Sequence, residues 1–185
     1  MFQEASVPEP PVFVTVTVTN INDPPYVANT ACSVAENSAV GTTACGLVVL
    51  DPDTATPSYS LALVAQEVPG LFDLSGNLLR VATAALNFET KPSYTVTVRA
   101  TDSADLTSFT DTRIVVSVTD VNEPPVVVAT LLTVPEASRA GWVVGSVRAW
   151  DPENDTLVFT LDTDGSAGAL ALQAGRDQLE ILDMA

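Results

Sequence analysis

The 185-residue sequence contains no histidine, only seven lysines and arginines, and no long apolar run. Without histidine, the chain has no Ser-His-Asp set and no imidazole to activate a cysteine. Nucleic acids and anionic membrane surfaces both require clustered cations, which this sequence does not have. No stretch reaches the roughly 18 consecutive apolar residues of a membrane-spanning helix. We therefore expect no enzymatic activity, no nucleic-acid partner and no direct membrane insertion by this segment.

Acidic residues are in large excess. The sequence has 23 aspartates and glutamates, which gives a formal net charge of -16. Hydrophobic residues make up 46% of the chain, so a packed core is expected and extensive disorder is not. The acidic surplus indicates general solubility, cation sites dense in carboxylates, or both.

The chain repeats itself at an offset of 100 residues. The segment NINDPP at residues 20–25 recurs as DVNEPP at residues 120–125, and DPD at residues 51–53 recurs as DPE at residues 151–153. A period near 100 residues is too long for a solenoid unit and matches the size of a β-sandwich domain. The same offset aligns three alternating apolar positions: Val14 with Ile114, Val16 with Val116 and Val18 with Val118.

The pattern within each period is all-β. Residues 14–19 and 94–100 alternate apolar and polar side chains, as half-buried strands do. Turn-forming pairs such as Asn37-Ser38 and Pro69-Gly70 separate these runs, and no helical period exceeds about two turns. The sequence therefore predicts tandem seven-stranded Greek-key sandwiches of the Ig-like type, with the first and last repeats truncated.

The repeat predicts three parts. Residues 1–24 correspond to the C-terminal strand and linker of a preceding repeat, residues 25–122 to a complete repeat, and residues 123–185 to the N-terminal part of a following repeat. The last part cannot bury both sheet faces unless the rest of its fold is supplied from elsewhere. We therefore expect exposed strand edges there.

Many of the acids lie in turns and linkers rather than along strand faces. A single aspartate in a turn needs no metal, because aspartate forms turns by itself. An ordered set across two repeats is different, because the loops of a sandwich gather at its two ends, where carboxylates without cationic partners repel one another. Calcium, which takes about six to eight oxygen ligands in a tolerant geometry, fits such a set. The lack of histidine and of thiol pairs for metal disfavours zinc and copper.

Residues 12–183 resemble an array of cadherin repeats. Five motifs carry the resemblance, in this order: Val34-Ala35-Glu36-Asn37, Asp51-Pro52-Asp53, Leu86-Asn87-Phe88-Glu89, Arg99-Ala100-Thr101-Asp102 and Asp120-Val121-Asn122-Glu123. The resemblance implies the cadherin form of the seven-stranded sandwich, with calcium ions (Ca2+) at the joints between repeats.

The resemblance also implies the ligands of each joint. For the first joint they are Asn22, Asp23, Asp51, Asp53 and Asp102. For the second joint they are Glu36, Asn87, Glu89, Asp120 and Glu123 from the middle repeat and its linker, with Asn122, Asp151 and Glu153 completing it. Asn87, Glu123 and Glu153 stand where the family usually has aspartate, so weaker binding than in the strongest members is expected. The set at the first joint is the more complete of the two within this chain.

The resemblance implies a segment of an extracellular adhesion protein that calcium stiffens into a rod. Its partners would be other cadherin-like repeats in cis or in trans, including homophilic contacts. It would lie at the cell surface, in the ectodomain of a membrane protein whose anchor is outside this chain. The alternative interpretation is a metal-free Ig-like or fibronectin-like spacer, or a glycan-binding module, of a secreted enzyme or microbial adhesin.

The cysteines and tryptophans lead to separate predictions. Cys32 and Cys45 flank the Glu36 turn, on strands expected to be adjacent and antiparallel, and this placement suits a disulfide, although two free buried thiols also fit. Trp142 and Trp150 are interpreted as core or junction packing, with an aromatic adhesion surface as the alternative. The glycosylation sequon that begins at Asn154 lies in the predicted calcium loop and is interpreted as a coincidence.

Overall fold

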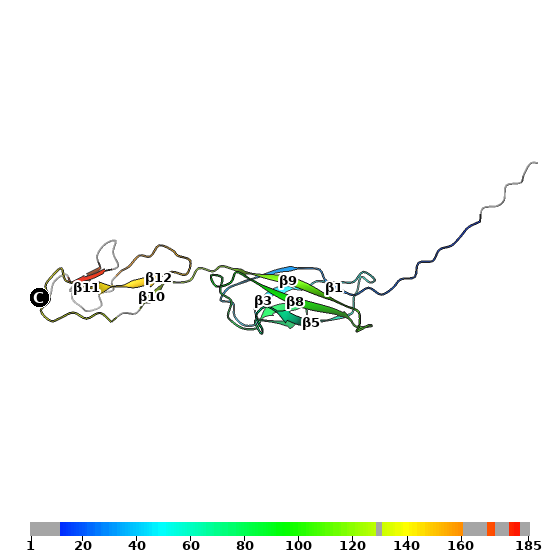
Figure 1. Ribbon diagram of the computed structural model, residues 1–185, viewed down its shortest axis with the longest axis horizontal. Coiled ribbons are helices and arrows are strands. Elements are labelled where there is room, and N and C mark those ends of the chain that lie inside the picture. Colours follow the sequence, from blue (N-terminus) through cyan, green and yellow to red (C-terminus); the bar gives the residue numbers. More distant parts are fainter. Residues whose placement is uncertain (1–11, 129–130, 161–169, 173–177, 182–185) are drawn as a thin grey trace, which may run out of the picture.

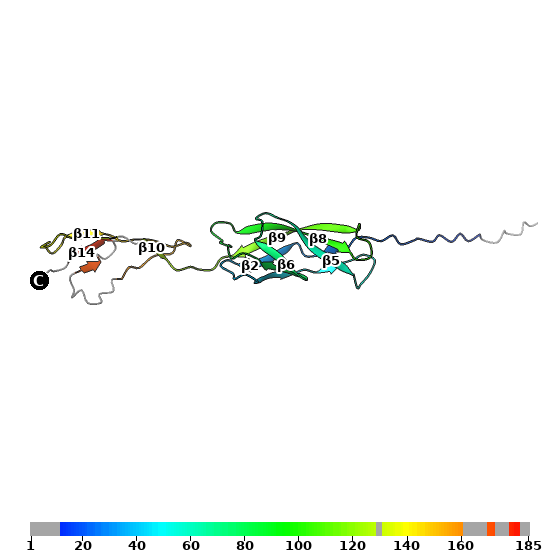
Figure 2. The same ribbon diagram turned by 90° about the horizontal axis from the view of Figure 1, so that it is seen from below.

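The computed structural model describes residues 12–128, 131–160, 170–172 and 178–181. The molecule is elongated, with a central sandwich between the extended segment that precedes it and the part that follows it (Figures 1 and 2). The described residues form strands and turns only, so they contain no helix that could cross a membrane.

The central sandwich is built from nine strands. These are β1 (Tyr26–Val27), β2 (Ala31–Ala35), β3 (Thr43–Gly46), β4 (Val49–Leu50), β5 (Tyr59–Gln66), β6 (Phe72–Ser75), β7 (Leu78–Val81), β8 (Ser93–Asp102) and β9 (Phe109–Thr119). One sheet has the order β2-β9-β8-β5 and the other β3-β7-β6, while β1 and β4 form a separate pair. The two main sheets therefore contain seven strands, and the predicted all-β sandwich is confirmed.

Alternation along β8 and β9 produces the core between the sheets. Val96 and Val98 on β8 and Ile114 and Val116 on β9 are fully buried, whereas the intervening Val115 points outward and is partly exposed. Val96 lies opposite Ile114 in the antiparallel ladder, so the two strands direct their apolar faces to the same side. Each such side chain contributes roughly 1.5–3 kcal/mol on full burial.

The parallel pairing of β2 with β9 positions Glu36, one of the predicted ligands. Their register runs from Ala31 opposite Val115 to Ala35 opposite Thr119, and among the described strands β9 is the sole partner of β2. Because parallel strands end at the same edge of a sheet, Glu36, directly after β2, lies beside the linker that follows β9. The amide of Glu36 donates to the carbonyl of Thr119 at 3.0 Å.

The part after the linker repeats some of this arrangement. Its strands are β10 (Val126–Val128), β11 (Val143–Ser146), β12 (Arg148–Trp150), β13 (Leu170–Leu172) and β14 (Gln178–Ile181). The pair β10-β12 corresponds to β1-β4, and the sheet β11-β14-β13 corresponds to β3-β7-β6. Residues 131–135, at the place of β2, do not form a strand.

The backbone conformations of the turns follow the same offset. Asn37 and Ala137 both have positive φ, at 54° and 59°. Gly41 and Gly141 have φ of 90° and 83°, a conformation that glycine adopts without a Cβ clash. The repeat seen in the sequence is therefore a repeat of local backbone structure.

Cys32 and Cys45 form a disulfide with a Cα–Cα distance of 5.4 Å, so the predicted bond is confirmed. The prediction of adjacent antiparallel strands was wrong, because Cys32 lies on β2 in one sheet and Cys45 on β3 in the other. The disulfide therefore joins the two sheets. In the next repeat the same places hold Leu132 and Gly145. A Cβ added to Gly145 would lie 2.5 Å from the Leu132 side chain.

One other expectation was wrong, and another was wrong in part. Residues 14–19 are not a strand in this structure, and their valines are exposed, because no described strand lies beside them. Of the two places expected for Trp142 and Trp150, the core is wrong, because both side chains are about half exposed. Trp150 lines a groove at the second joint with Pro124, which agrees with the expected junction packing.

Candidate metal centre

Four glutamates meet where the central sandwich joins the part that follows it. Glu36 comes directly after β2, Glu89 lies in the loop between β7 and β8, Glu123 lies in the linker and Glu153 follows β12. One carboxylate oxygen from each lies within 4.8 Å of those of the others. In the described part of the chain, this is the one group of three or more histidine, cysteine, aspartate or glutamate side chains gathered this closely.

Glu36 is the buried member and is fully paired. Its Oε2 accepts a hydrogen bond from the amide of Phe88 at 2.9 Å, and its Oε1 accepts one from the amide of Val121 at 2.7 Å. Burial, the largest single influence, raises the pKa of the Glu36 carboxyl, but the hydrogen bonds together outweigh it and hold the pKa below its ordinary value. Glu36 is therefore an ionised carboxylate that ties a loop and the linker to β2.

Glu123 and Glu153 are in the opposite situation. Oε2 of Glu123 and both carboxylate oxygens of Glu153 are buried without a hydrogen-bond partner among the described residues. The neighbouring Glu153 carboxyl, followed by burial, raises the pKa of Glu123 to about 7. Burial also raises the pKa of Asp120, followed by the charges of Glu153 and Glu36. Buried carboxylate oxygens that repel one another and lack donors fit a hard divalent cation.

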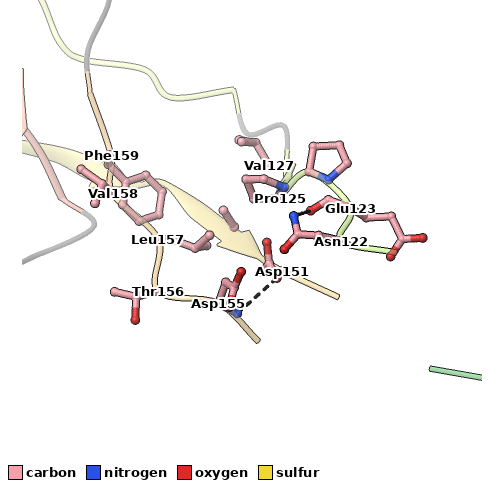
Figure 3. Close-up of a pocket in the computed structure, with 12 residues that line it drawn as sticks. Asn122, Glu123, Pro125, Val127, Asp151, Asp155, Thr156, Leu157, Val158 and Phe159 are labelled. Atoms are coloured by element: carbon pink, nitrogen blue, oxygen red, sulfur yellow. Dashed lines mark hydrogen bonds between the residues drawn. The ribbon is translucent and has the colours of Figure 1, made fainter. Parts of the chain in front are cut away.

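The remaining residues predicted for this joint shape its loops. Oδ1 of Asp151 accepts hydrogen bonds from the amides of Glu153 and Asp155, both at 3.1 Å. Asn122 donates to the carbonyl of Glu123 at 3.2 Å. Asn122, Asp151 and Asp155 lie on the polar side of a cavity of about 370 Å³ beside the cluster (Figure 3). Asn87 donates to Glu89 Oε2 at 3.2 Å.

At the first joint, the aspartates hold the incoming linker through hydrogen bonds. Asp53 Oδ1 accepts from the Asn20 amide group at 2.9 Å, and its Oδ2 accepts from the backbone amide of Asp23 at 2.5 Å. These two bonds lower the pKa of the Asp53 carboxyl. Asn22 donates to the hydroxyl of Ser108 at 3.3 Å. The linker therefore contacts the loops that carry the predicted ligands.

The carboxylates of the first joint are engaged with their own loops. Asp51 Oδ1 accepts from the Asp53 amide at 2.8 Å, and Asp102, which is buried, accepts from the Ala104 amide at 2.7 Å. Asp51, Asp53 and Asp102 do not form a group as close as the glutamates, as far as the described residues show. Of the two predicted joints, the structure gathers the carboxylates of the second.

Asn37 makes a contact that the sequence pattern did not predict. Its side-chain amide donates to Oε1 of Glu123, across 86 positions of the chain. The positive φ of Asn37 turns the chain immediately after Glu36, so the two residues approach the linker together. Asparagine adopts this conformation more readily than most residues, and this preference is the signal that could have indicated its role.

The chain was compared with known proteins. The model of the family described as Cadherin domain matches residues 30–119. Cadherin EGF LAG seven-pass G-type receptor 2 from Homo sapiens is 30% identical over 186 residues, which cover 92% of this chain and 6% of the receptor. Protocadherin gamma-A12 from Homo sapiens is 34% identical over 167 residues, which cover 85% of this chain and 18% of that protein. The chain thus spans less than a fifth of the length of these relatives.

Solved structures show the same fold. The crystal structure of human protocadherin-24 EC1-2, form II, superposes with a TM-score of 0.61 at 22% identity, covering 89% of this chain and 80% of that one. Mouse cadherin-23 EC22-24 superposes with a TM-score of 0.58 at 21% identity, covering 88% of this chain and 55% of that one.

Proposed function

The chain belongs to the cadherin family, and from this premise we propose that it is a calcium-binding segment of an extracellular adhesion protein. In this proposal the acidic joints are flexible without calcium, and ions held between repeats stiffen the array into a rod. The role is structural rather than catalytic. The units are those predicted from the sequence, with residues 1–24, 25–122 and 123–185 belonging to three successive repeats.

The observation that carries the proposal is the convergence of Glu36, Glu89, Glu123 and Glu153. These side chains come from three segments of the middle repeat and its linker and from the loop that follows β12 in the next repeat. Three of their oxygens are buried and unpaired, so repulsion between them opposes docking of the two repeats. An ion bound there would neutralise that charge and join the repeats.

The residues of the two proposed sites have different roles. Glu36 orients the linker through the amide of Val121, and Glu89, Glu123 and Glu153 offer the oxygens that bind. Asp120, Asn122, Asp151 and Asn87 complete the proposed second site, and Asn22, Asp23, Asp51, Asp53 and Asp102 form the proposed first site. The hydrogen bonds of Asp53 to Asn20 and Asp23 support the first site, because they bring the linker onto the aspartate loop.

The proposed location and partners follow from the relatives. Their names describe a seven-pass receptor and a protocadherin, so we place this segment in the ectodomain of a cell-surface protein. Its partners would then be other cadherin repeats, in cis along one surface or in trans between two surfaces.

Calcium titration of the whole chain tests the proposal. Isothermal calorimetry should detect binding, the melting temperature should rise, and small-angle scattering should show a narrower range of molecular lengths with calcium than with chelator. Glu89→Gln combined with Glu153→Gln should weaken binding by at least tenfold. Glu136→Gln, which changes an exposed acid outside the cluster, should leave binding unchanged. No response up to about 10 mM calcium, above the range of extracellular calcium modules, would contradict the proposal.

A further inference from the structure

Asn154, Asp155 and Thr156 form an N-glycosylation sequon, in which an asparagine is followed two positions later by threonine and the residue between them is not proline. It is the one complete sequon in the 185-residue sequence. The sequence pattern gives it no role, because it lies in a loop predicted to bind calcium. The structure shows which side chains of this loop face the joint and which do not.

The side chains of Asn154 and Thr156 are both accessible. Both residues are exposed, and neither side chain has a hydrogen-bond partner among the described residues. Asn154 has a φ of 62°, a left-handed conformation that asparagine adopts more readily than most residues. The turn therefore explains an asparagine at position 154, but it does not require a threonine at position 156.

The exposure of these two positions belongs to the loop itself. In the middle repeat, where residues 25–122 are all described, Thr54 and Thr56 occupy the equivalent positions and are also exposed. A complete sandwich around the loop therefore leaves both positions open to solvent. Carbohydrate attached to Asn154 would extend away from the protein.

The hydrogen bonds that shape the loop do not use the side chain of Asn154. Oδ1 of Asp151 accepts the backbone amides of Glu153 and Asp155, both at 3.1 Å. The backbone amide of Asn154 donates to the carbonyl of Asp151, also at 3.1 Å. The carboxylate of Glu153, one residue earlier, belongs to the group of four glutamates. A glycan on Asn154 therefore replaces none of these bonds and leaves Glu153 in place.

Asn37 provides an internal contrast at the same joint. It is also exposed, and its φ of 54° is close to that of Asn154. Its side-chain amide, however, donates to Oε1 of Glu123 within the group of glutamates. It has no sequon, because Ala39 stands two positions later. Of the two asparagines with positive φ among the described residues, the sequon belongs to the one whose side chain is free.

We propose that Asn154 is an N-glycosylation site beside the second joint, and that its carbohydrate leaves the joint intact. The side-chain nitrogen of Asn154 forms a bond to the anomeric carbon of an oligosaccharide carried on a polyprenyl diphosphate. The bond from that carbon to the diphosphate breaks, the diphosphate leaves with the electron pair, and the amide proton passes to a base of the transferase. This inference rests on the extracellular location in the proposed function, because the transfer takes place in the secretory pathway.

Secretion of the whole 185-residue chain from eukaryotic cells, behind a cleavable export signal, tests the site. Mass spectrometry should find carbohydrate on the peptide that contains Asn154, and peptide-N-glycosidase should increase the mobility of the chain in a denaturing gel. Thr156→Ser should keep the modification, because it keeps the hydroxyl. Thr156→Ala and Asn154→Gly should lose it, and the glycine retains the left-handed turn.

The melting temperature in chelator and the calcium affinity test whether the joint stays intact. The glycosylated parent should match the unglycosylated Thr156→Ala variant in both, with affinities within about twofold, as for changes on an exposed surface. Ala39→Thr, which completes a second sequon at Asn37, is the matched comparison. A glycan at Asn37 would remove the hydrogen bond to Glu123, so this variant should melt at a lower temperature and bind calcium roughly tenfold more weakly.

Ala39→Thr also shows whether the chain reaches the transferase. A chain glycosylated at Asn37 but not at Asn154 would overturn the proposal, and so would a secreted parent without carbohydrate at Asn154. A glycosylated parent that melts well below Thr156→Ala would show that the carbohydrate disturbs the joint. Carbohydrate at Asn154 in a chain that binds no calcium would instead contradict the proposed function and leave the glycosylation site standing.

Discussion

Glu36 and Val121 lie 85 positions apart, and Oε1 of Glu36 accepts the amide hydrogen of Val121 at 2.7 Å. The other oxygen of the same carboxylate accepts the amide of Phe88 at 2.9 Å. One buried side chain therefore fixes the linker and a proposed ligand loop to the end of β2 without requiring an ion. In the proposed calcium site, this half of the joint would be organised before an ion binds.

Replacing Glu36 with alanine should leave the backbone amides of Phe88 and Val121 without an acceptor. Each buried donor that loses its charged acceptor costs about 1–3 kcal/mol. Because two donors are affected, Glu36→Ala should lower the free energy of unfolding in chelator by roughly 2–4 kcal/mol. Urea unfolding followed by circular dichroism measures this. Glu136→Ala, at the exposed counterpart of Glu36, is the control and should change it by less than about 0.5 kcal/mol. Equal effects of the two substitutions would show that Glu36 does not organise the joint.

The pKa of Glu123 predicts a pH dependence. Its folded value of about 7 lies above the ordinary 4.5, so the folded chain binds this proton more tightly than the unfolded chain does. The associated stabilisation is complete below pH 4.5 and is lost as the pH rises toward 7. The lowered pKa of Glu36 acts in the opposite direction. The stabilisation from the ionised Glu36 carboxylate is present at neutral pH and is lost as the pH falls below its ordinary pKa of 4.5.

Glu153→Gln isolates this effect. In chelator its melting temperature should match the parent near pH 5 and exceed it at pH 8, because the variant removes the main cause of the raised pKa. With saturating calcium the order should reverse, because the variant has lost a ligand. Glu136→Gln should differ from the parent by the same amount at both pH values. A pH-independent difference for Glu153→Gln would contradict the coupling of Glu123 and Glu153.

The sequence predicted the middle sandwich because its strands follow local patterns, and the family resemblance pointed to the four glutamates that the structure gathers at the second joint. The alternation of apolar and polar residues along β8 and β9 predicts which side chains face inward, and the repeat places acids in equivalent loops. Alternation does not state whether a partner strand is present, which is why the strand predicted at residues 14–19 is absent here. Cys32 and Cys45 were placed on adjacent strands for a similar reason, because spacing along the chain does not show that the intervening turn crosses between sheets.

The unpaired oxygens of Glu123 and Glu153 could not be predicted from residue types. Both glutamates stand in loops, and whether a loop carboxylate is solvated or buried depends on how the two repeats approach one another. The contact of Asn37 with Glu123 has the same origin, since it joins a turn to a linker 86 positions away. Long-range packing, rather than local propensity, determines these details.

The disulfide should contribute to the stability of the middle repeat. It closes a loop with a sequence separation of 13, for which the chain-entropy account gives about 3 kcal/mol. Cys32→Ala combined with Cys45→Ala should lower the free energy of unfolding by this amount in a urea titration. Reducing agent should destabilise the parent to a similar extent and leave the double variant unaffected. A double variant that remained sensitive to reductant would show that the effect arises elsewhere.

Two neighbouring positions on β9 test the alternation of buried and exposed side chains along this strand. Ile114 is fully buried opposite Val96, so Ile114→Ala should cost about 2–5 kcal/mol through lost transfer energy and the cavity it leaves. Val115 is on the outward face and 43% exposed, so Val115→Ala should cost less than about 1 kcal/mol. Urea unfolding of both variants measures the difference. Similar costs at the two positions would mean that β9 does not present one face to the core.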